Sequence, residues 1–222
     1  MAPRGERYIS EPQAVQLLEK YGIPYPAYAF ARDAKEAAGI AEELGFPVVL
    51  KVVSPDVLHK SDAGGVLVGL ENRASVREGF TALVGRVSSA VPGAHIEGAL
   101  VCQEAPAGLE VIVGALEDET FGPTVMFGLG GIFAEVLRDV SFRVAPLHRR
   151  DAEEMIREIQ GYALLSGARG QASLDVEALV ELLLSVSRLV TEHREIRELD
   201  LNPVRVYEQG LLALDARIVM DA

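Results

Sequence analysis

The second half of the chain consists largely of strand-like segments, and no other feature of the sequence restricts the fold as strongly. From His95 onwards, clusters of Gly, Pro and Asp separate the apolar runs IEGALVCQEA, LEVIVGAL, TVMFGLG and FRVAPL. Short runs of this kind, divided by turn residues, are typical of strands that pair with their neighbours in antiparallel order. We therefore expect antiparallel sheet in this half of the chain.

The first half alternates helical and strand-like segments. The segments after Ser10 and Asp33 carry apolar residues at helical spacing, and serine and aspartate are favoured N-cap residues. The run FPVVLKVV is apolar and rich in β-branched residues, which is typical of a buried strand. A short strand at 66–70 and a helix at 75–87 are expected to follow.

The chain closes with two helices and a pair of strands. Apolar residues at helical spacing predict helices at 151–160 and 175–192. The segments IRELDLNPVRV and LLALDARIV have the pattern of strands, and a short turn that contains Gly210 joins them.

The order of these elements predicts an α+β protein of two lobes, with a boundary near residues 95–104. We assign residues 20–101 to the smaller lobe. The larger lobe is expected to contain residues 102–222, with residues 1–19 packed on it.

The charge of the chain argues against nucleic acid and membranes as main partners. Lysine and arginine total 21 against 33 aspartates and glutamates, so the formal net charge is -12. A chain of this charge repels a nucleic-acid backbone and an anionic membrane surface. No apolar run is long enough to span a bilayer, and the single cysteine, Cys102, excludes an intrachain disulfide. These features predict a cytoplasmic protein that holds any anionic ligand with a few placed groups.

The commonest nucleotide and hydrolase motifs are absent. The chain has no Gly-Lys dipeptide for a P-loop, no His-Glu-x-x-His and no Gly-x-Ser-x-Gly, and Gly128-Leu129-Gly130-Gly131 lacks the third glycine of a dinucleotide fingerprint. These glycines, followed by Glu135, Asp139 and Arg143, predict instead a backbone nest and a guanidinium for a phosphate. The alternative is a simple turn between a strand and a helix.

Two basic side chains lie close together in the sequence of the smaller lobe. Lys51 lies within the apolar run FPVVLKVVS, where an unpaired ammonium group is costly to bury. It either meets an anion in a cleft or, as an edge lysine, extends to water. His59 follows in the polar loop LHKSDAGG, where a histidine acts as a base, accepts a phosphoryl group or is simply solvated. Gly64 and Gly65 offer backbone amides that phosphate oxygens can approach closely.

Oxygen-bearing side chains gather in the terminal strand pair. Asp200 and Asn202 lie two residues apart on one strand, and Asp215 lies on the other. On one face of a hairpin they offer the hard oxygen ligands that Mg²⁺ prefers, although acids on hairpins are usually solvated. Apolar residues flank both aspartates, and an unpaired carboxylate is costly there, which favours a metal or a basic partner.

Two glutamates near the lobe boundary are further candidates. The backbone at Gln103 and Glu104 is expected to recognise the edge of an adenine. Glu110 is expected to bind a ribose or to act as an acid in the cleft.

Three separated segments resemble one protein family. They are FPVVLKVVSPDVLHKSDAGGV, GLEVIVGALEDETFGPTVMFGLGGIFAEVLRDVSFRVAPL, and RELDLNPVRV with ALDARI. In these segments the chain resembles the ATP-grasp β subunit of the ADP-forming acetyl-CoA (acyl-CoA) synthetases, and the resemblance extends from about Ser10 to Ile218. It implies a two-lobed ATP-grasp fold whose antiparallel sheets clamp ATP or ADP with Mg²⁺.

The resemblance also implies roles for individual residues. Lys51 would hold the nucleotide phosphates, Glu104 would lie at the adenine hinge, and His59 would be a transient phosphoryl carrier. The implied metal ligands are Asn202 and Asp215. Asp200 would be the catalytic acid beside them. The other expected nucleotide contacts are Glu110, Gly130, Gly131 and Arg143.

The implied activity is that of an acid–CoA ligase (ADP-forming). In such enzymes acyl-CoA and phosphate give an acyl phosphate, a histidine of the partner α subunit takes the phosphoryl group, and the β-subunit site passes it to ADP. The chain carries no CoA-binding domain. We therefore expect it to need a CoA-binding α subunit, in an α2β2 heterotetramer, and to be inactive alone in the full reaction.

Two alternatives stay open. One is the nucleotide lobe of a succinyl-CoA synthetase β chain, which in that family is followed by a further ligase domain; the end of the sequence shortly after Ile218 argues against it. The other is a non-catalytic ATP-sensing subunit, which the presence of Lys51, His59, Asn202 and Asp215 disfavours. The sequence does not distinguish between acyl substrates, between adenine and guanine nucleotides, or between a natural subunit and a piece of a fused synthetase.

Overall fold

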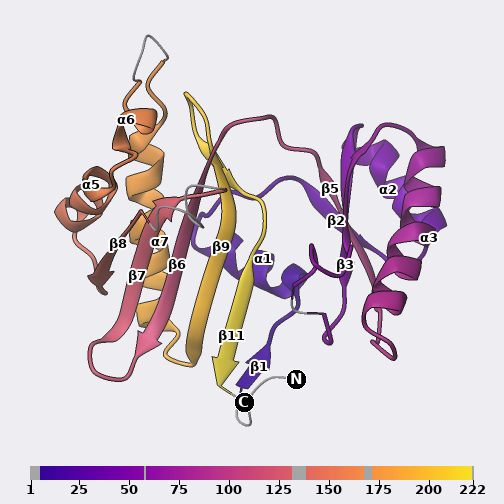
Figure 1. Cartoon of the computed structure of the whole chain (residues 1–222), viewed down its shortest axis with the longest axis horizontal. Coiled ribbons are helices and arrows are strands. Elements are labelled where there is room, and N and C mark those ends of the chain that lie inside the picture. The colour runs from indigo at the N-terminus through magenta and orange to yellow at the C-terminus, as the bar shows by residue number, and fades with distance from the viewer. Residues whose placement is uncertain (1–5, 58, 132–138, 168–171, 222) are drawn as a thin grey trace. The chain divides into compact units, whose positions relative to one another are not determined.

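The chain divides into two compact units (Figure 1). The computed structural model describes residues 6–57, 59–131, 139–167 and 172–221. The smaller unit contains Pro26–Pro106, and the larger unit contains the chain up to Tyr25 together with Ala107–Ala222. The predicted boundaries, after residues 19 and 101, fall inside a helix and a strand, and the structure moves both to the connecting segments.

The smaller unit is a four-stranded sheet with helices on one face. Its elements in chain order are β2 (Tyr28–Ala31), α2 (Ala34–Leu44), β3 (Val48–Val53), β4 (Val66–Leu70), α3 (Arg73–Ala90) and β5 (Gly98–Gln103). The strands are antiparallel, in the order β2-β5-β3-β4. Asp33 begins α2 by accepting the N–H groups of Lys35 and Glu36 at 2.7 and 2.9 Å. Apolar residues of α2 and α3 form a core with alternate residues of β3, which leaves Lys51 on the other face of the sheet.

The larger unit is built on a seven-stranded sheet, and every strand pair in it is antiparallel. Its strands are β1 (Glu6–Tyr8), β6 (Leu109–Asp118), β7 (Gly122–Leu129), β8 (Val140–Val144), β9 (Ile196–Val206), β10 (Leu211–Ala213) and β11 (Arg217–Asp221). Their order is β1-β11-β9-β6-β7-β8, and β10 pairs with the end of β9. The antiparallel sheet expected from the sequence is confirmed.

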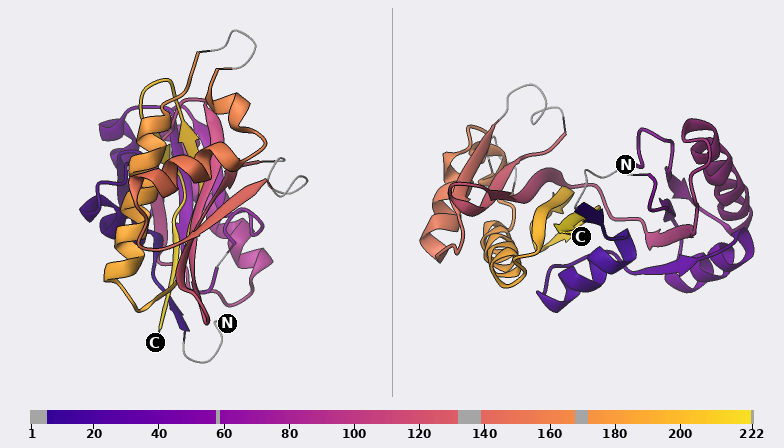
Figure 2. Two further views of the ribbon diagram at one scale, coloured as in Figure 1. Left: turned by 90° about the vertical axis from the view of Figure 1, so that its left-hand side faces the viewer. Right: turned by 90° about the horizontal axis from the view of Figure 1, so that it is seen from below.

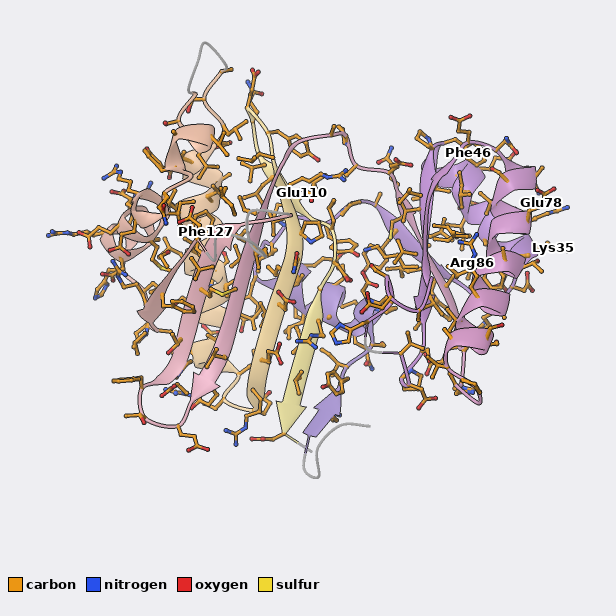
Figure 3. All side chains as sticks on the ribbon, in the orientation of Figure 1. Lys35, Phe46, Glu78, Arg86, Glu110 and Phe127 are labelled. Carbon is orange, nitrogen blue, oxygen red and sulfur yellow. The ribbon has the colours of Figure 1, made fainter. Side chains whose placement is uncertain are left out.

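Helices cover one face of the larger sheet. They are α1 (Glu11–Lys20), α5 (Arg149–Glu158), α6 (Tyr162–Leu165) and α7 (Val176–Glu192). Figure 2 shows α5 and α7 against the sheet. Met155 of α5 and Leu183 of α7 pack with Val113 of β6 and Phe127 of β7, which is labelled in Figure 3. Residues that alternate with Val113 and Phe127 therefore point to the opposite face, called here the open face.

Two details differ from the sequence-based expectations. The strand in IEGALVCQEA, which is β5, pairs with β2 and β3 in the smaller unit and not with the strands that follow it. The segment LLALDARIV is two strands, because residues 214–216 between β10 and β11 leave the ladder. Within the described ranges, every helix is too short or too polar to cross a bilayer.

Candidate functional site

A groove lies on the open face of the larger sheet. Its volume is about 830 Å³, and its lining includes Gly114, Met126, Glu198, Asp200 and Asn202. Asp200 lies opposite Gly114 of β6 on one side and opposite Arg217 of β11 on the other. Gly114 has no side chain, and the side chain of Met126 lies against this position, 3.3 Å from where a Cβ would be.

The oxygen donors predicted from the sequence lie at this groove or next to it. Asp200 and Asn202 are on the same face of β9, since side chains alternate along a strand. Asp215 precedes β11, and its neighbour Leu214 donates its N–H to the carbonyl oxygen of Pro203 at 2.9 Å. The backbone thus brings Asp215 to the part of β9 that carries Asn202.

These donors fit Mg²⁺ in chemical type. Carboxylate and amide oxygens are hard ligands, and Mg²⁺ in proteins is commonly held by one or two carboxylates together with waters and substrate phosphates. In the part of the chain that the structure describes, no three His, Cys, Asp or Glu side chains form a metal site by themselves. Asp215 and the amide of Asn202 would therefore supply only part of the coordination, and oxygens of a bound phosphate would supply the rest.

Guanidinium groups that the sequence analysis did not single out also lie on the open face: Arg197 lines the groove, and Arg205 and Arg217 lie on the same face. Arg205 donates through Nε to Oε1 of Glu110 at 3.1 Å, and Arg217 is paired with Glu198; Glu110 is labelled in Figure 3. Glu110 is thus an acceptor for arginine in this structure. Arg205 lies between Val204 and Val206, which are buried on the helix side of the sheet. Because side chains alternate along a strand, these two valines could have placed Arg205 on the open face.

Arg143 lies on the opposite face from Asp200. Its partner across the sheet is Val125, a core residue, and Nη1 of Arg143 donates to Oε2 of Glu158 on α5 at 2.9 Å. This hydrogen bond raises the pKa of Arg143 and lowers that of Glu158. The structure gives no support to the predicted contact between Arg143 and a phosphate, because the side chain points into the helical layer.

Replacing Arg143 with alanine tests this reassignment. An exposed or half-exposed ion pair contributes little, so we expect the free energy of unfolding to fall by less than about 1 kcal/mol. Binding of ADP by the full chain should not change. Urea unfolding and calorimetric titration with ADP measure the two quantities, and a tenfold loss of ADP affinity at unchanged stability would restore Arg143 to the site.

The glycine turn after β7 is explained by the backbone. Gly130 donates its N–H to the carbonyl oxygen of Glu110 at 2.7 Å, and a Cβ at this position would lie 2.9 Å from that oxygen. Gly131 has a φ of +62°, which favours glycine. Asp139 accepts the N–H groups of Gln160 and Gly161, both at 2.7 Å, so it anchors the end of α5. Glu135 lies outside the described residues.

In the smaller unit, Lys51 is buried, with 7% of its surface exposed. It lies on the face of β3 away from the helices, opposite Val66 of β4. The chain between β3 and β4 therefore begins two residues after Lys51 and returns directly beside it. His59 lies on this connection and is exposed, as a group that exchanges a phosphoryl with another molecule must be.

The two glycines on this connection do not offer free amides. Gly64 donates its N–H to Ser61 at 3.1 Å, and Gly65 donates its N–H to Lys60 at 2.7 Å. A Cβ on Gly65 would lie 2.5 Å from the side chain of Val52. The expected phosphate contacts of these amides are therefore not supported, and the glycine at 65 is needed for close packing on β3.

Glu104 has a structural partner at the end of β5. Its Oε2 accepts the N–H of Gly69 at 2.8 Å, and its own N–H donates to the carbonyl oxygen of Pro47 at 3.0 Å. The N–H of Gln103 donates to Ala27 at 2.8 Å. Recognition of an adenine edge at this position would have to use carbonyl oxygens, because both N–H groups are already bonded.

Comparison with known proteins identifies the class to which this fold and these residues belong. A family model described as the ATP-grasp domain matches residues 1–220, and the chain belongs to that family. The beta subunit of acetate–CoA ligase [ADP-forming] I of Pyrococcus furiosus is 47% identical over 214 residues, which cover 96% of this chain and 92% of the relative. Acetate–CoA ligase [ADP-forming] I of Archaeoglobus fulgidus is 48% identical over 208 residues, and the match spans 94% of this chain and 30% of that longer protein.

Solved structures give the same result. The dinucleotide-forming acetyl-coenzyme A synthetase 1 of Ca. Korarchaeum cryptofilum, in complex with coenzyme A and Ca-AMPCP, matches with a TM-score of 0.94 at 48% identity and covers 96% of this chain and 93% of that one. Another structure of that enzyme contains Mg-AMPPCP and has its phosphohistidine segment pointing towards the nucleotide binding site. By contrast, the succinate–CoA ligase [ADP-forming] beta subunit of Acidithiobacillus ferrooxidans is 26% identical, and the match covers 56% of its length.

Proposed function

We propose that this chain is the nucleotide-binding subunit of an ADP-forming acyl-CoA synthetase and transfers a phosphoryl group between a histidine carrier and ADP or ATP. The observation that carries the proposal is the set of hard oxygen donors on the open face of a sheet in a chain of the ATP-grasp family. The names of relatives that match along almost their whole length support the reaction class. The lower identity of the succinate–CoA ligase beta subunit, 26% against 47% for the acetate–CoA ligase beta subunit, disfavours that alternative.

Each unit by itself offers candidate groups for the nucleotide. Lys51 is the buried cation of the smaller unit and is proposed to bind phosphate oxygens. Asn202 and Asp215 are proposed to hold Mg²⁺, with Asp200 beside them. When bound, Mg²⁺ neutralises phosphate charge and orients the phosphates for in-line transfer. The described lining of the groove contains five carboxylates and one arginine, so an anionic ligand would need the charge of Mg²⁺ to bind there.

His59 is proposed as the residue that carries the phosphoryl group. A nitrogen of the neutral imidazole ring attacks the phosphorus of the phosphohistidine on the α subunit, a new P–N bond forms to His59, and the P–N bond of the donor breaks with its electron pair returning to the donor ring. In the second step a terminal β-phosphate oxygen of ADP attacks, a P–O bond forms, and the P–N bond returns its electron pair to the ring. Little covalent chemistry is required of other residues, and positioning and charge neutralisation supply the catalysis.

The chain is proposed to act with a CoA-binding α subunit, in an α2β2 assembly. Longer relatives, of which this chain matches 30%, and relatives that are named beta subunits support a partner of this kind. Adenine is the proposed base because the nucleotide analogues named in the related structures are adenine nucleotides. The acyl substrate would be bound mainly by the partner.

Two measurements test the function. The full chain should bind AMPPCP more tightly with Mg²⁺ than with EDTA in a calorimetric titration. After co-purification with a candidate α partner, it should form ATP from acetyl-CoA, ADP and phosphate. Failure to bind Mg-AMPPCP would contradict nucleotide binding, whereas binding without ATP formation by a complete complex would favour the ATP-sensing alternative.

A further inference from the structure

The segment that carries Asp215 is held from two sides. Ala213 donates its N–H to the carbonyl oxygen of Pro24, and Leu214 donates its N–H to that of Pro203, both at 2.9 Å. The next peptide group joins Leu214 to Asp215 and is planar, so the position of the Leu214 oxygen also determines that of the Asp215 nitrogen. A group that holds this oxygen therefore restricts the direction in which the Asp215 side chain leaves the backbone.

The hydroxyl of Tyr25 lies between this oxygen and a carboxylate. Its hydrogen is donated mainly to Oε1 of Glu11 at 2.5 Å, and the carbonyl oxygen of Leu214, at 3.2 Å, is the weaker second acceptor. The shorter distance is in the range of charge-assisted O–H···O bonds and fixes the ring of Tyr25 firmly. The phenol thus links the start of α1 to the backbone next to Asp215.

Glu11 is an unusual residue at this depth. It is the first residue of α1, and only 5% of its surface is exposed. Burial of a carboxylate is costly unless charge or hydrogen bonds compensate it. The N-terminus of α1 and the phenol of Tyr25 both do so here.

We propose that Tyr25, held by Glu11, is a positioning residue that orients Asp215 toward the metal of the bound nucleotide. The inference rests on the proposed function, because it takes Asp215 as a metal ligand. Groups that orient a ligand through a hydrogen bond typically change metal affinity by 10- to 100-fold. A single bond to a backbone carbonyl should act at the lower end of this range.

The test is Tyr25→Phe in the full chain, because this change removes the hydroxyl and keeps the ring. AMPPCP is titrated with Mg²⁺ and again with EDTA, and the ratio of the two affinities is called the magnesium gain. We expect the magnesium gain to fall about tenfold, with the affinity in EDTA unchanged. Glu11→Gln keeps an oxygen that accepts the phenol bond, so its magnesium gain should fall by less.

Tyr21→Phe is the matched control. Tyr21 lies in the same unit and donates to Oε2 of Glu192 at 2.6 Å, so this variant also loses one bond from a tyrosine to a carboxylate. It should keep the full magnesium gain, and it should lose less stability than Tyr25→Phe because the bond of Tyr21 is exposed. If the magnesium gain fell equally in both tyrosine variants, the fall would reflect a general loss of stability, and the positioning role would be overturned.

Asp215→Ala separates the two proposals. If Asp215→Ala loses the magnesium gain and Tyr25→Phe keeps it, the positioning role is overturned and the proposed metal ligand stands. If Asp215→Ala keeps the magnesium gain, the assignment of Asp215 as a metal ligand, on which the inference rests, is itself wrong.

Discussion

Net formation of ATP by the complete synthetase is expected to fall at least about a thousandfold when His59 is replaced with alanine. Removal of a residue that forms a covalent intermediate typically costs this much or more, because no other group takes over its bond to the substrate. Affinity for Mg-AMPPCP should stay within about twofold, since the phosphate and metal groups are unchanged. The coupled assay with the α partner measures turnover, and calorimetry measures binding.

His95→Ala is the control for this experiment. His95 is exposed and in the same unit, and it is its backbone N–H that donates to Asp56, at 2.7 Å. The substitution keeps that bond, so turnover should be normal. Turnover of the His59 variant at the unaltered rate would remove the relay role, and a parallel loss of Mg-AMPPCP binding would show that His59 acts in nucleotide binding instead.

The second large effect is expected for Asp215→Ala. Loss of a direct ligand should lower the affinity for Mg-AMPPCP by at least about a hundredfold, because even groups that only orient a ligand cost 10- to 100-fold. The affinity for AMPPCP in EDTA should be unchanged or slightly higher, since a negative charge near the phosphates is removed. Calorimetric titrations at several Mg²⁺ concentrations distinguish weaker metal binding from weaker nucleotide binding.

Asp221→Ala provides the comparison on β11, the strand that follows Asp215, at a residue that lines the same groove. Asp221 lies at the far end of β11 and accepts from Nε of Arg197 at 2.6 Å. Its replacement should have little effect on the magnesium dependence of AMPPCP binding. Equal losses in the two aspartate variants would indicate a general effect of negative charge and argue against a ligand at position 215.

The two variants together also test the ATP-sensing alternative. A sensor needs Asp215 and Lys51 to bind Mg-ATP but does not need His59 as a carrier. An enzyme needs all of them. If the chain is part of an enzyme, the complete complex with the unaltered chain should form ATP. The complex with the His59 variant should still bind Mg-AMPPCP but should not form ATP.

Much of the fold could be predicted from local sequence pattern. The β-branched run around Lys51 and the alternating residues of β6 and β7 predict strands because burial on a pleated surface selects such residues. The pairing of β5 with β2 and β3 could not be predicted in this way. The apolar pattern of β5 fits pairing with the strands before it as well as pairing with the strands after it. Contacts between residues distant in sequence decide between the two.

In the candidate site, too, the sequence predicts the local features and does not predict the contacts between distant residues. Spacing alone places Asp200 and Asn202 on one face of a strand, since side chains alternate with a period of two. Spacing could not reveal that Arg205 is bonded to Glu110 and that Arg143 is bonded to α5. Nor could it show that the amides of Gly64, Gly65 and Glu104 are used by the backbone.

What the sequence determined by itself is therefore the identity of the elements and the side of each strand on which a residue lies. Only the tertiary structure decided the partners of the polar groups. Tyr25 meets Leu214 across 189 positions of the chain, and Arg205 meets Glu110 across 95. The reason is physical: periodicity depends on backbone geometry within a few residues, whereas a hydrogen bond depends on which distant segments the packing of the core brings together.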